Sequence, residues 1–412
     1  MPRPSRPPSR SNKKKPEPRR AEPVKKPGYF AMVARTIRGL EPGLVQELNA
    51  IGAENVREHN RAVTFDGTTA LMYRANLQLR TALRVLKPIY TFHIQTQQDF
   101  YRKLLDFQWS EFLQVDDTLA IDTAVHSPIF SNSLFVAMKA KDAIVDQFRK
   151  HTGRRPSVDL EHPTIRFHIH LLNNLCTLSL DSSGESLHRR GYRGDAMQAP
   201  INEVLAAGMI ALAGPPPANG PFVDPMCGAG TIAIEAALAA WNIAPGLSRK
   251  HFGFMNWPDF DETLWKTTVA ATRSEARTSA PTVYAADVSA RAIRIASENL
   301  NRTELPESAI QFEIKPFDQY QPPPGPGLVM MNPPYGERLQ VKSAPSLEDF
   351  YKSIGDRLKQ SYTDYTAWIL SSNIEALKRV GLTATRKVQL FNGPLDCSFR
   401  KYELYAGSRK KN

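Results

Sequence analysis

The second half of the chain alternates short apolar runs with longer helical runs, and this alternation constrains the fold more than any other feature. Four of the apolar runs lead to polar residues in turn, at Asp224, Asp287, Asp318 and Asn332. Alternating β and α segments predict a parallel, doubly wound sheet. Because the carboxyl ends of parallel strands lie at one edge, where such sheets bind ligands, we expect these four residues to lie together.

Residues 28–185 follow a different rhythm, in which helices alternate with strands of period two and no glycine-rich nucleotide loop occurs. The pattern predicts a helix over residues 69–89 that Pro88 ends, a long helix ended by Gly153, and a hairpin around Asn173 and Asn174. This region is therefore expected to consist of small α+β units. A bridge of basic residues, 187–194, connects it to the second half.

The net charge of +12 is concentrated at the N-terminus, where residues 1–27 hold ten Lys and Arg, two Glu and eight Pro. A segment of this composition cannot bury enough apolar surface to fold alone, so we expect a disordered basic tail. A solvated tail and an arm for nucleic-acid phosphates remain equally compatible with it. Residues 406–412 are expected to form a second basic tail.

Other bulk features exclude several classes of protein. No apolar run reaches the length of a membrane span, and the N-terminus lacks the apolar core of a secretory signal. Cys176, Cys227 and Cys397 are far apart and form no CxxC pair. A disulfide framework and a four-thiolate zinc site are therefore not expected. We expect a cytoplasmic protein without a membrane segment or a metal.

The turn after the first apolar strand, "DPMCGAGT", is typical of ligand contact. Gly228 and Gly230 allow the backbone to approach a ligand closely, and the acidic Asp224 suits an ammonium group or hydroxyls better than a phosphate. Cys227 in this turn is expected to be a packing residue. An insertion, residues 241–278, accounts for most of the 63-residue interval between Asp224 and Asp287.

The next two strand ends predict the rest of this ligand. A carboxylate at the tip of the second strand, here Asp287, usually accepts hydrogen bonds from a ribose diol. Phe317 and Asp318 could supply an apolar face and an acceptor for adenine, although Asp318 could equally cap a helix or turn. Together the strand ends suit an adenosine-like ligand without phosphate, such as S-adenosylmethionine.

The fourth strand runs into Asn332-Pro333-Pro334-Tyr335. Two adjacent prolines make a stiff turn that fixes the Asn332 side chain and the Pro333 carbonyl. Both are acceptors that can take the two hydrogens of a ring –NH₂ group, and Tyr335 can stack on a flipped base. The turn therefore predicts methyl transfer to an exocyclic amine. For the tetrapeptide alone, a rigid surface turn is the alternative.

Four motifs together resemble the bacterial THUMP-domain RNA guanine-2-amino methyltransferases, in particular the ribosomal RNA large subunit methyltransferase L group. They are "DPMCGAGTIAIEAA", "NPPYGERL", "SLHRRGYR" with "APINE", and "WNIAPGL…FGFMNW". The resemblance implies a ferredoxin-like region over residues 28–70 and a THUMP RNA-binding domain over residues 71–185. It further implies a Rossmann-like class I methyltransferase domain over residues 186–405, with a mostly parallel seven-stranded sheet.

The resemblance also implies a site. It assigns catalysis to Asn332, Pro333, Pro334 and Tyr335. It assigns S-adenosylmethionine binding to Asp224, Pro225, Cys227, Gly228, Gly230, Thr231, Asp287, Val288, Asp318, Asn332 and Pro200. The implied reaction is methylation of a guanosine 2-amino group, with 23S ribosomal RNA as the expected substrate. Some relatives carry a second methyltransferase domain; with the chain ending at residue 412, only this one activity is expected.

RNA phosphates are expected to contact basic residues at two places. The candidates are Arg149, Lys150, Arg154 and Arg155 after the long helix, and Arg189, Arg190 and Arg193 in the bridge. A tRNA guanosine remains open as the target. An adenine 6-amino group in DNA and a non-catalytic ribosome-assembly factor that binds RNA are weaker alternatives. Cytosine 5-methylation would need a thiolate, and no cysteine lies at the fourth strand end. The oligomeric state is left open.

Overall fold

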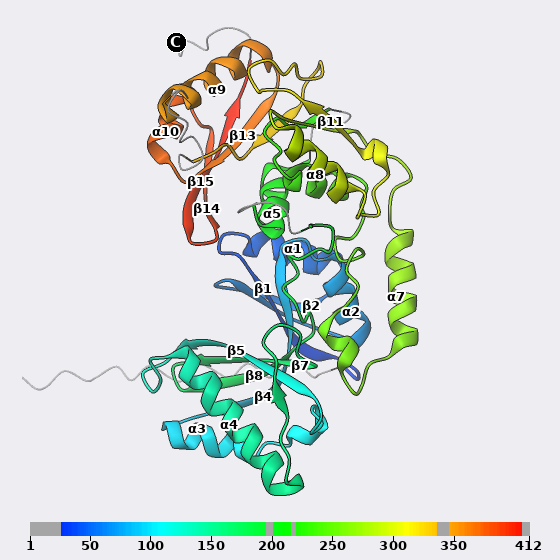
Figure 1. Cartoon of the computed structure of the whole chain (residues 1–412), viewed down its shortest axis with the longest axis vertical. Helices are drawn as coiled ribbons and strands as arrows, with labels where there is room; N and C mark the ends of the chain where they lie inside the picture. Colours follow the sequence, from blue (N-terminus) through cyan, green and yellow to red (C-terminus); the bar gives the residue numbers. More distant parts are fainter. Residues whose placement is uncertain (1–25, 195–200, 216–219, 336–345, 406–412) are drawn as a thin grey trace, which may run out of the picture.

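The computed structural model describes residues 26–194, 201–215, 220–335 and 346–405, so nearly all of both expected tails lies outside the described residues. Three parts follow one another along the long axis of the molecule (Figure 1). The C-terminal part lies at one end, residues 28–86 lie in the middle, and the region around α3 and α4 lies at the other end. Within the described residues, none of the helices combines the length and apolarity needed to cross a bilayer.

One eight-stranded sheet, in the order β2-β3-β1-β4-β8-β7-β5-β6, runs through the N-terminal half. Its strands are β1 Phe30–Thr36, β2 Glu54–His59, β3 Ala62–Gly67, β4 Ala82–His93, β5 Thr118–His126, β6 Ser157–Val158, β7 Ile165–Leu172 and β8 Leu175–Asp181. The helices of this half are α1 Glu41–Ala50, α2 Thr69–Gln78, α3 Gln97–Leu105, η1 Trp109–Glu111 and α4 Ser133–Thr152. The hairpin expected around Asn173 is confirmed as β7–β8.

The helix expected over residues 69–89 is wrong in its second half. The helix α2 ends at Gln78, and β4 begins at Ala82. Residues of β4 up to Leu86 pair with β1, and residues from Leu86 onward pair with β8. Pro88 lies where the register with β8 shifts, which is a position that tolerates a residue without an N–H. Pairing on both sides outweighs the helical spacing of the apolar residues, and it joins the two α+β units into one sheet.

The C-terminal half contains a seven-stranded sheet in the order β11-β10-β9-β12-β13-β15-β14. Its strands are β9 Phe222–Asp224, β10 Val283–Asp287, β11 Ile310–Ile314, β12 Leu328–Met331, β13 Thr366–Ser371, β14 Arg386–Asn392 and β15 Leu395–Glu403. The first five strands of this order are parallel, and β15 is antiparallel to both of its neighbours. The expected Rossmann-like, mostly parallel seven-stranded sheet is confirmed.

Alternate residues of the central strands pack into two cores, one on each face of this sheet. In β12, Leu328 and Met330 join one cluster, while Val329 and Met331 join the other. The first core lies under α5 Glu203–Ala213 and α6 Thr231–Ala240, and the second lies under α9 Leu347–Ser361 and α10 Ile374–Arg379. Helix α8 Ala290–Leu300 and the short helix η3 Glu307–Ala309 also belong to this half. Burial on both faces explains why these strands are continuously apolar.

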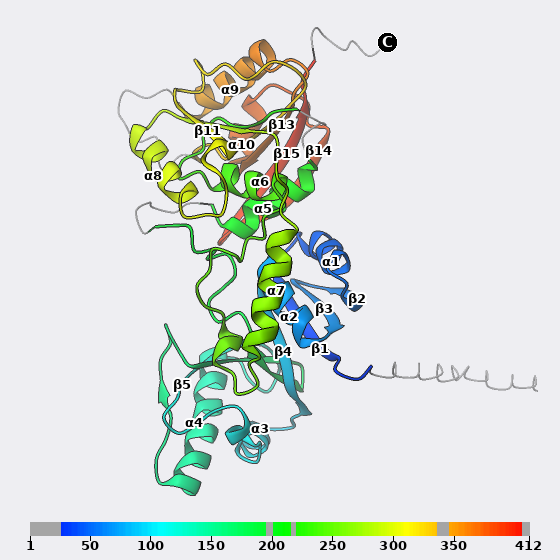
Figure 2. The same cartoon turned by 90° about the vertical axis from the view of Figure 1, so that its right-hand side faces the viewer.

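The insertion leaves the C-terminal half and packs on the N-terminal half. It forms η2 Gly253–Asn256 and α7 Glu262–Ser274, and α7 lies along α2 (Figure 2). Phe252, Phe254 and Trp257 are buried in the core of the N-terminal half. The ring centroids of Phe254 and Tyr73 are 4.4 Å apart. The insertion therefore connects the two sheets through its packing.

Candidate active site

The four strand ends singled out in the sequence meet at one edge of the seven-stranded sheet. Strands β11, β10, β9 and β12 are adjacent and parallel, so their carboxyl ends point the same way. Asp224 and Asp287 are the last residues of β9 and β10, and Asn332 directly follows β12. The hairpin end between β14 and β15 lies at the same edge, because β15 runs antiparallel to β13.

Asp224 is a buried carboxylate that lacks a partner. Its side chain is completely buried, and neither carboxylate oxygen has a hydrogen-bond partner among the described residues. Burial raises the pKa of Asp224 to about 8, and the nearby Asp287 carboxylate raises the pKa further. The Met226 amide lowers the pKa of Asp224, although it does not reach hydrogen-bonding geometry. An orphaned buried acceptor is costly unless a donor reaches it, so this carboxylate is suited to a cationic or hydroxyl-bearing ligand.

The turn after Asp224 is held against the neighbouring strand. Gly228 and Gly230 both have positive φ, at 54° and 80°, and the Gly228 N–H donates to Asp287 Oδ2 at 2.9 Å. A Cβ on Gly230 would lie 2.9 Å from the Cβ of Ala296, so the close approach of α8 requires glycine there. Cys227 is buried, its N–H donates to the Ala286 carbonyl at 3.0 Å, and burial raises the pKa of its thiol. Its position agrees with a packing role.

Asp287 and Val288 offer a polar and an apolar surface side by side. Asp287 Oδ1 accepts from the Ser289 N–H at 2.9 Å. Val288, the next residue, is 70% exposed. A large exposed apolar side chain at the ligand-binding edge of an α/β sheet provides a surface against which a flat ring can lie.

After β11, Phe317 and Asp318, the pair expected to contact adenine, lie in different environments. Asp318 is exposed in the turn that follows the strand. Phe317 is buried, and its ring stacks on Tyr362 with the centroids 5.9 Å apart. The expectation that Phe317 offers its face to an adenine is therefore wrong, because that ring belongs to the core under α9. Only Asp318 remains available for a ligand.

The Asn332–Tyr335 turn is held by two tyrosine hydroxyls, one from the turn itself and one from α9. The Tyr335 hydroxyl donates a short hydrogen bond to Asn332 Oδ1, and the Tyr351 hydroxyl donates to the Pro334 carbonyl at 3.4 Å. The Tyr335 ring is half-buried against the core that contains Cys397, and burial raises the pKa of Tyr335. Residues 336–345, which follow the turn, lie outside the described residues.

The segment before α5 is described only in part. Pro200, an expected cofactor contact, lies outside the described residues. Asn202 caps α5, accepting from the N–H groups of Val204 at 2.9 Å and Leu205 at 3.3 Å. The next residue, Glu203, is buried with its carboxylate 3.2 Å from Arg193 Nη2, and burial raises the pKa of Glu203 to about 7. This ion pair was not predicted from the sequence, because only the fold brings the two side chains together.

The basic residues of the bridge differ sharply in environment. The Arg190 side chain is 2% exposed and pairs with the buried Glu235 at 3.4 Å, so its expected role as an RNA contact is wrong. Arg193 is 25% exposed and donates to Thr231 Oγ1 and the Ile201 carbonyl, both at 3.0 Å. It therefore ties the bridge to the first turn of α6. Arg189 is 66% exposed.

The basic residues after α4 remain accessible. Arg149, Lys150, Arg154 and Arg155 are all exposed at or just beyond the C-terminal end of that helix. Arg154 pairs with Asp116 on the surface, and Arg149 lies 3.7 Å from Asp146. Exposed pairs of this kind contribute little to stability and can exchange partners. The structure is compatible with phosphate contacts here.

Three family models match the chain in succession. They are the RlmL ferredoxin-like domain over residues 31–86, the THUMP domain over residues 95–181 and the RMKL-like methyltransferase domain over residues 190–401. The first match ends within β4, whereas the sequence placed that boundary after residue 70. This difference has the same origin as the missed strand β4.

Individual relatives agree with these models. A Synechocystis protein, provisionally named an RNA methyltransferase, is 41% identical over 92% of this chain and 97% of its own length. The ribosomal RNA large subunit methyltransferase K/L of Methylococcus capsulatus is 39% identical over 89% of this chain and 50% of its own length. The chain thus spans about half the length of that relative.

A solved structure agrees over the whole fold. It is of a protein provisionally described as a methyltransferase, complexed with S-adenosylhomocysteine. It is 27% identical, with a TM-score of 0.77, and the match covers 94% of this chain and 100% of that one. The methyltransferase fold and the THUMP and ferredoxin-like regions expected from the motifs are confirmed. The chain therefore belongs to the RMKL-like methyltransferase family, and it carries a ferredoxin-like and a THUMP domain ahead of its methyltransferase domain.

Proposed function

We propose that the protein methylates the 2-amino group of a guanosine in 23S ribosomal RNA, in the cytoplasm, with S-adenosylmethionine as methyl donor. One observation carries the proposal. The stiff Asn332–Tyr335 turn presents a fixed amide oxygen at the sheet edge where Asp224 holds an orphaned, buried carboxylate. An acceptor for an amine and a site for a cationic ligand thus share one edge.

The residues at this edge fit the cofactor. Asp224 offers its unpartnered carboxylate to the ammonium group, and Asp287 retains lone pairs for a ribose diol after accepting two backbone N–H groups. Val288 offers an exposed apolar surface and Asp318 an exposed carboxylate to the adenine. Gly228 and Gly230 allow close backbone approach. The bound cofactor supplies an electrophilic methyl group.

The chain's own residues orient the amine. Asn332 Oδ1 and the Pro333 carbonyl accept its two hydrogens, which favours a more pyramidal nitrogen with an available lone pair. The amide oxygen has two lone pairs, so Asn332 can accept from Tyr335 and from the substrate at once. In this arrangement the Tyr335 hydroxyl is a positioning group for Asn332. Stacking of the Tyr335 ring on the target base remains a prediction.

The choice of RNA rests on the family and on the motifs. A THUMP domain supports an RNA substrate. The resemblance to the L group and the name of the Methylococcus capsulatus relative favour ribosomal RNA. A tRNA guanosine remains the alternative. Because this chain spans about half of that relative, the proposal is limited to one methyl-transfer activity.

The test is transfer of labelled methyl from S-adenosylmethionine to unmodified 23S ribosomal RNA and to tRNA, followed by nucleoside analysis. We expect label in N²-methylguanosine from the ribosomal RNA. Label in tRNA would redirect the proposal to the alternative substrate. Label in 6-methyladenosine, or in no RNA at all, would contradict it.

Asn332→Ala tests the proposed acceptor. Loss of one oriented electrostatic group should lower kcat by about 10²- to 10³-fold. Binding of S-adenosylhomocysteine, measured by calorimetry, should stay within about twofold of wild type because Asp224 and Asp287 are intact. Asn301→Ala, at the exposed end of α8, is the control and should leave kcat unchanged. Full activity in Asn332→Ala would remove Asn332 from the reaction.

A further inference from the structure

A large cleft lies where the THUMP domain, the bridge and the insertion meet. Its volume is about 930 Å³, and its walls come from residues between 161 and 166, between 184 and 194, and between 248 and 256. We call it the junction cleft. The first and third of these segments were not among the expected RNA contacts. The cleft therefore combines parts of the chain that are far apart in sequence.

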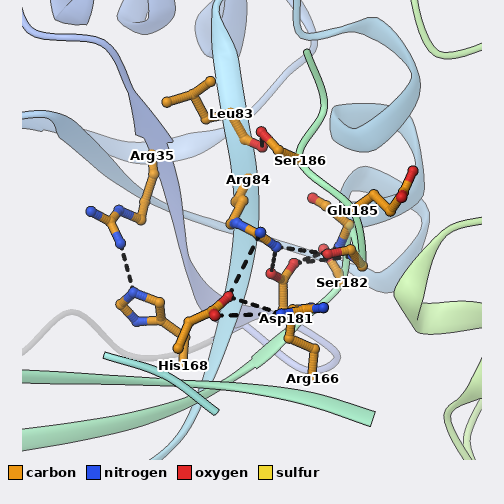
Figure 3. Close-up of polar contacts among 12 residues, drawn as sticks. Arg35, Leu83, Arg84, Arg166, His168, Asp181, Ser182, Glu185 and Ser186 are labelled. Atoms are coloured by element: carbon orange, nitrogen blue, oxygen red, sulfur yellow. Dashed lines mark hydrogen bonds and ion pairs between the residues drawn. The ribbon is translucent and has the colours of Figure 1, made fainter. Parts of the chain in front are cut away.

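Partly buried arginines hold the wall of the junction cleft in place. Arg249 donates to the carbonyls of Ser183, Glu185, Ser186 and Arg189 at 2.6–3.1 Å. Arg84 reaches from β4 to Asp181 and to the turn that follows β8 (Figure 3), donating to the Gly184 carbonyl at 2.7 Å. These guanidinium groups therefore make their hydrogen bonds to residues of the wall.

Glycines bring the insertion into direct contact with the opposite wall. A Cβ on Gly191, which has a φ of 97°, would lie 2.4 Å from the Ser248 carbonyl oxygen. A Cβ on Gly253 would lie 2.5 Å from the Asp181 carbonyl oxygen and 2.8 Å from the Gly184 nitrogen. The backbones meet too closely for side chains at these points. The junction cleft is therefore a preformed feature of the packing.

Two cationic side chains that line the cleft take no part in the wall contacts and remain accessible. Lys250 is exposed and forms no hydrogen bond or ion pair with any residue that the structure describes. Arg189 is 66% exposed, and among the described residues its side chain pairs with Glu185 alone, on the surface. A surface pair of this kind is weak, so a phosphate can replace the carboxylate. His162 and His251 are exposed beside them and add further donors.

The lining of the junction cleft touches the candidate active site through one residue. Arg193, Gly194 and Glu203 are among the lining residues. Arg193 donates to Thr231 Oγ1 at 3.0 Å, and Thr231 is the first residue of α6, directly after the glycine turn. Glu161 and His162, in the loop before β7, also line the cleft. The lining thus combines residues of the THUMP domain with Arg193, which contacts the residue after the glycine turn.

We propose that the junction cleft binds the phosphate backbone of a single-stranded RNA segment that runs from the THUMP domain toward Asn332, with Arg189 and Lys250 as phosphate contacts. The inference rests on the proposed function. A base that reacts at its amino group must leave its pair, so the RNA next to the site is unpaired. Phosphate contacts then fix the register of this segment without reading its sequence. The insertion supplies one wall of the RNA path.

The test compares two double variants of the full chain. Arg189→Ala with Lys250→Ala removes both proposed contacts. Arg294→Ala with Lys266→Ala removes the same two residue types from helices α8 and α7, where the side chains are 72% and 71% exposed. The probes are a 20-nucleotide polyuridylate and an unmodified 23S ribosomal RNA transcript. Binding is measured over a range of salt concentrations, and S-adenosylhomocysteine binding is measured in parallel.

We expect the cleft variant to bind both RNAs about tenfold more weakly than the control at low salt. The slope of log affinity against log salt should become shallower by about 1.4, because each phosphate contact to a single strand contributes about 0.7. Binding of S-adenosylhomocysteine should be unchanged. If the cleft variant binds RNA as the control does while wild type methylates RNA, the proposed role of the junction cleft is overturned and the proposed function stands. If wild type binds the cofactor but neither RNA, the proposed function falls as well.

Discussion

The edge of the seven-stranded sheet and the bridge are both rich in charged residues, but Asp224 at the edge and Arg190 in the bridge are satisfied to very different degrees. Single atoms around the bridge, such as Arg193 Nε and Glu235 Oε2, also lack a partner among the described residues, but Arg190 does not. At the sheet edge, Asp224 is fully buried and its two oxygens have no hydrogen-bond partner among the described residues. In the bridge, the buried Arg190 donates to the Leu187 and Arg80 carbonyls and pairs with Glu235. Unsatisfied buried groups indicate a ligand site, whereas satisfied ones indicate architecture. The predictions below test this distinction from both sides.

The largest effect is expected from Arg190→Ala. This change leaves Glu235 buried near the Arg80 guanidinium, with the Tyr192 hydroxyl at 3.1 Å as its remaining hydrogen-bond donor among the described residues. Breaking a buried ion pair by removing one partner typically costs about 3–5 kcal/mol, so the free energy of unfolding should fall by that amount. Denaturant unfolding measures it. The neighbouring Arg189→Ala, on an exposed side chain, should change stability by less than about 0.5 kcal/mol.

A double variant tests whether the lost stability comes from the unpaired charge. Arg190→Leu combined with Glu235→Leu removes both charges and should recover part of the lost stability. Equal unfolding free energies for Arg190→Ala and Arg189→Ala would show that the buried pair is not structural, and the contrast between the two regions would fail.

Asp224→Asn should have the next largest effect, on cofactor binding. A charge-assisted hydrogen bond to an otherwise unpartnered buried carboxylate contributes about 1.5–3 kcal/mol, so S-adenosylhomocysteine should bind roughly tenfold to hundredfold more weakly. Calorimetry measures this. Asp364→Asn is the control, because Asp364 is exposed and has a φ of 67° that Asn tolerates. An unchanged affinity in Asp224→Asn would remove this carboxylate from the cofactor site.

The same carboxylate predicts a pH dependence. Without ligand, the pKa of Asp224 is raised to about 8, so the group is mostly protonated at pH 7. The cofactor ammonium favours the ionised form, so binding releases a proton and strengthens as the pH rises toward 8. Wild-type affinity for S-adenosylhomocysteine should increase roughly fivefold to tenfold from pH 6.5 to 7.5. Asp224→Asn should lose this increase; a flat wild-type profile would contradict it.

The smallest effect is expected from Tyr335→Phe, which removes the hydroxyl that holds Asn332 but keeps the ring. Losing one such hydrogen bond costs about 1 kcal/mol, so kcat should fall about fivefold. KM for RNA should be unchanged, because the ring is still present. Tyr335→Ala should raise KM as well if the ring also stacks on the base. Wild-type kcat in Tyr335→Phe would show that the hydroxyl does not position Asn332.

Much of the C-terminal half could be predicted from its sequence. Strands buried on both faces are continuously apolar, and each ends at a turn residue or glycine, so β9, β10, β11 and β12 were each recognised. The order in which their polar ends meet follows from parallel topology. The stiffness of the turn is a local property of Pro333 and Pro334, so the tetrapeptide sequence alone predicts it. The role of these side chains in methyl transfer still rests on chemistry that the variants above test.

Environment could not be predicted from residue type. Arg189 and Arg190 are adjacent and identical, yet one is exposed and the other is buried against Glu235, which lies 45 residues away in the chain. Strand β4 was missed because its partners β1 and β8 are distant in sequence, and Phe317 was misplaced because Tyr362 draws its ring into the core.

Local sequence specifies the alternation of strands and helices, the acidic strand ends, the glycine turn and the rigid Asn332–Tyr335 turn. These features depend on local backbone preference and on spacing along the chain. The three-dimensional arrangement of the chain is needed to see which charges are satisfied, where the insertion packs and that a cleft opens beside the bridge. Those outcomes depend on contacts between distant segments, because burial and hydrogen bonding are set by what lies opposite a residue in space.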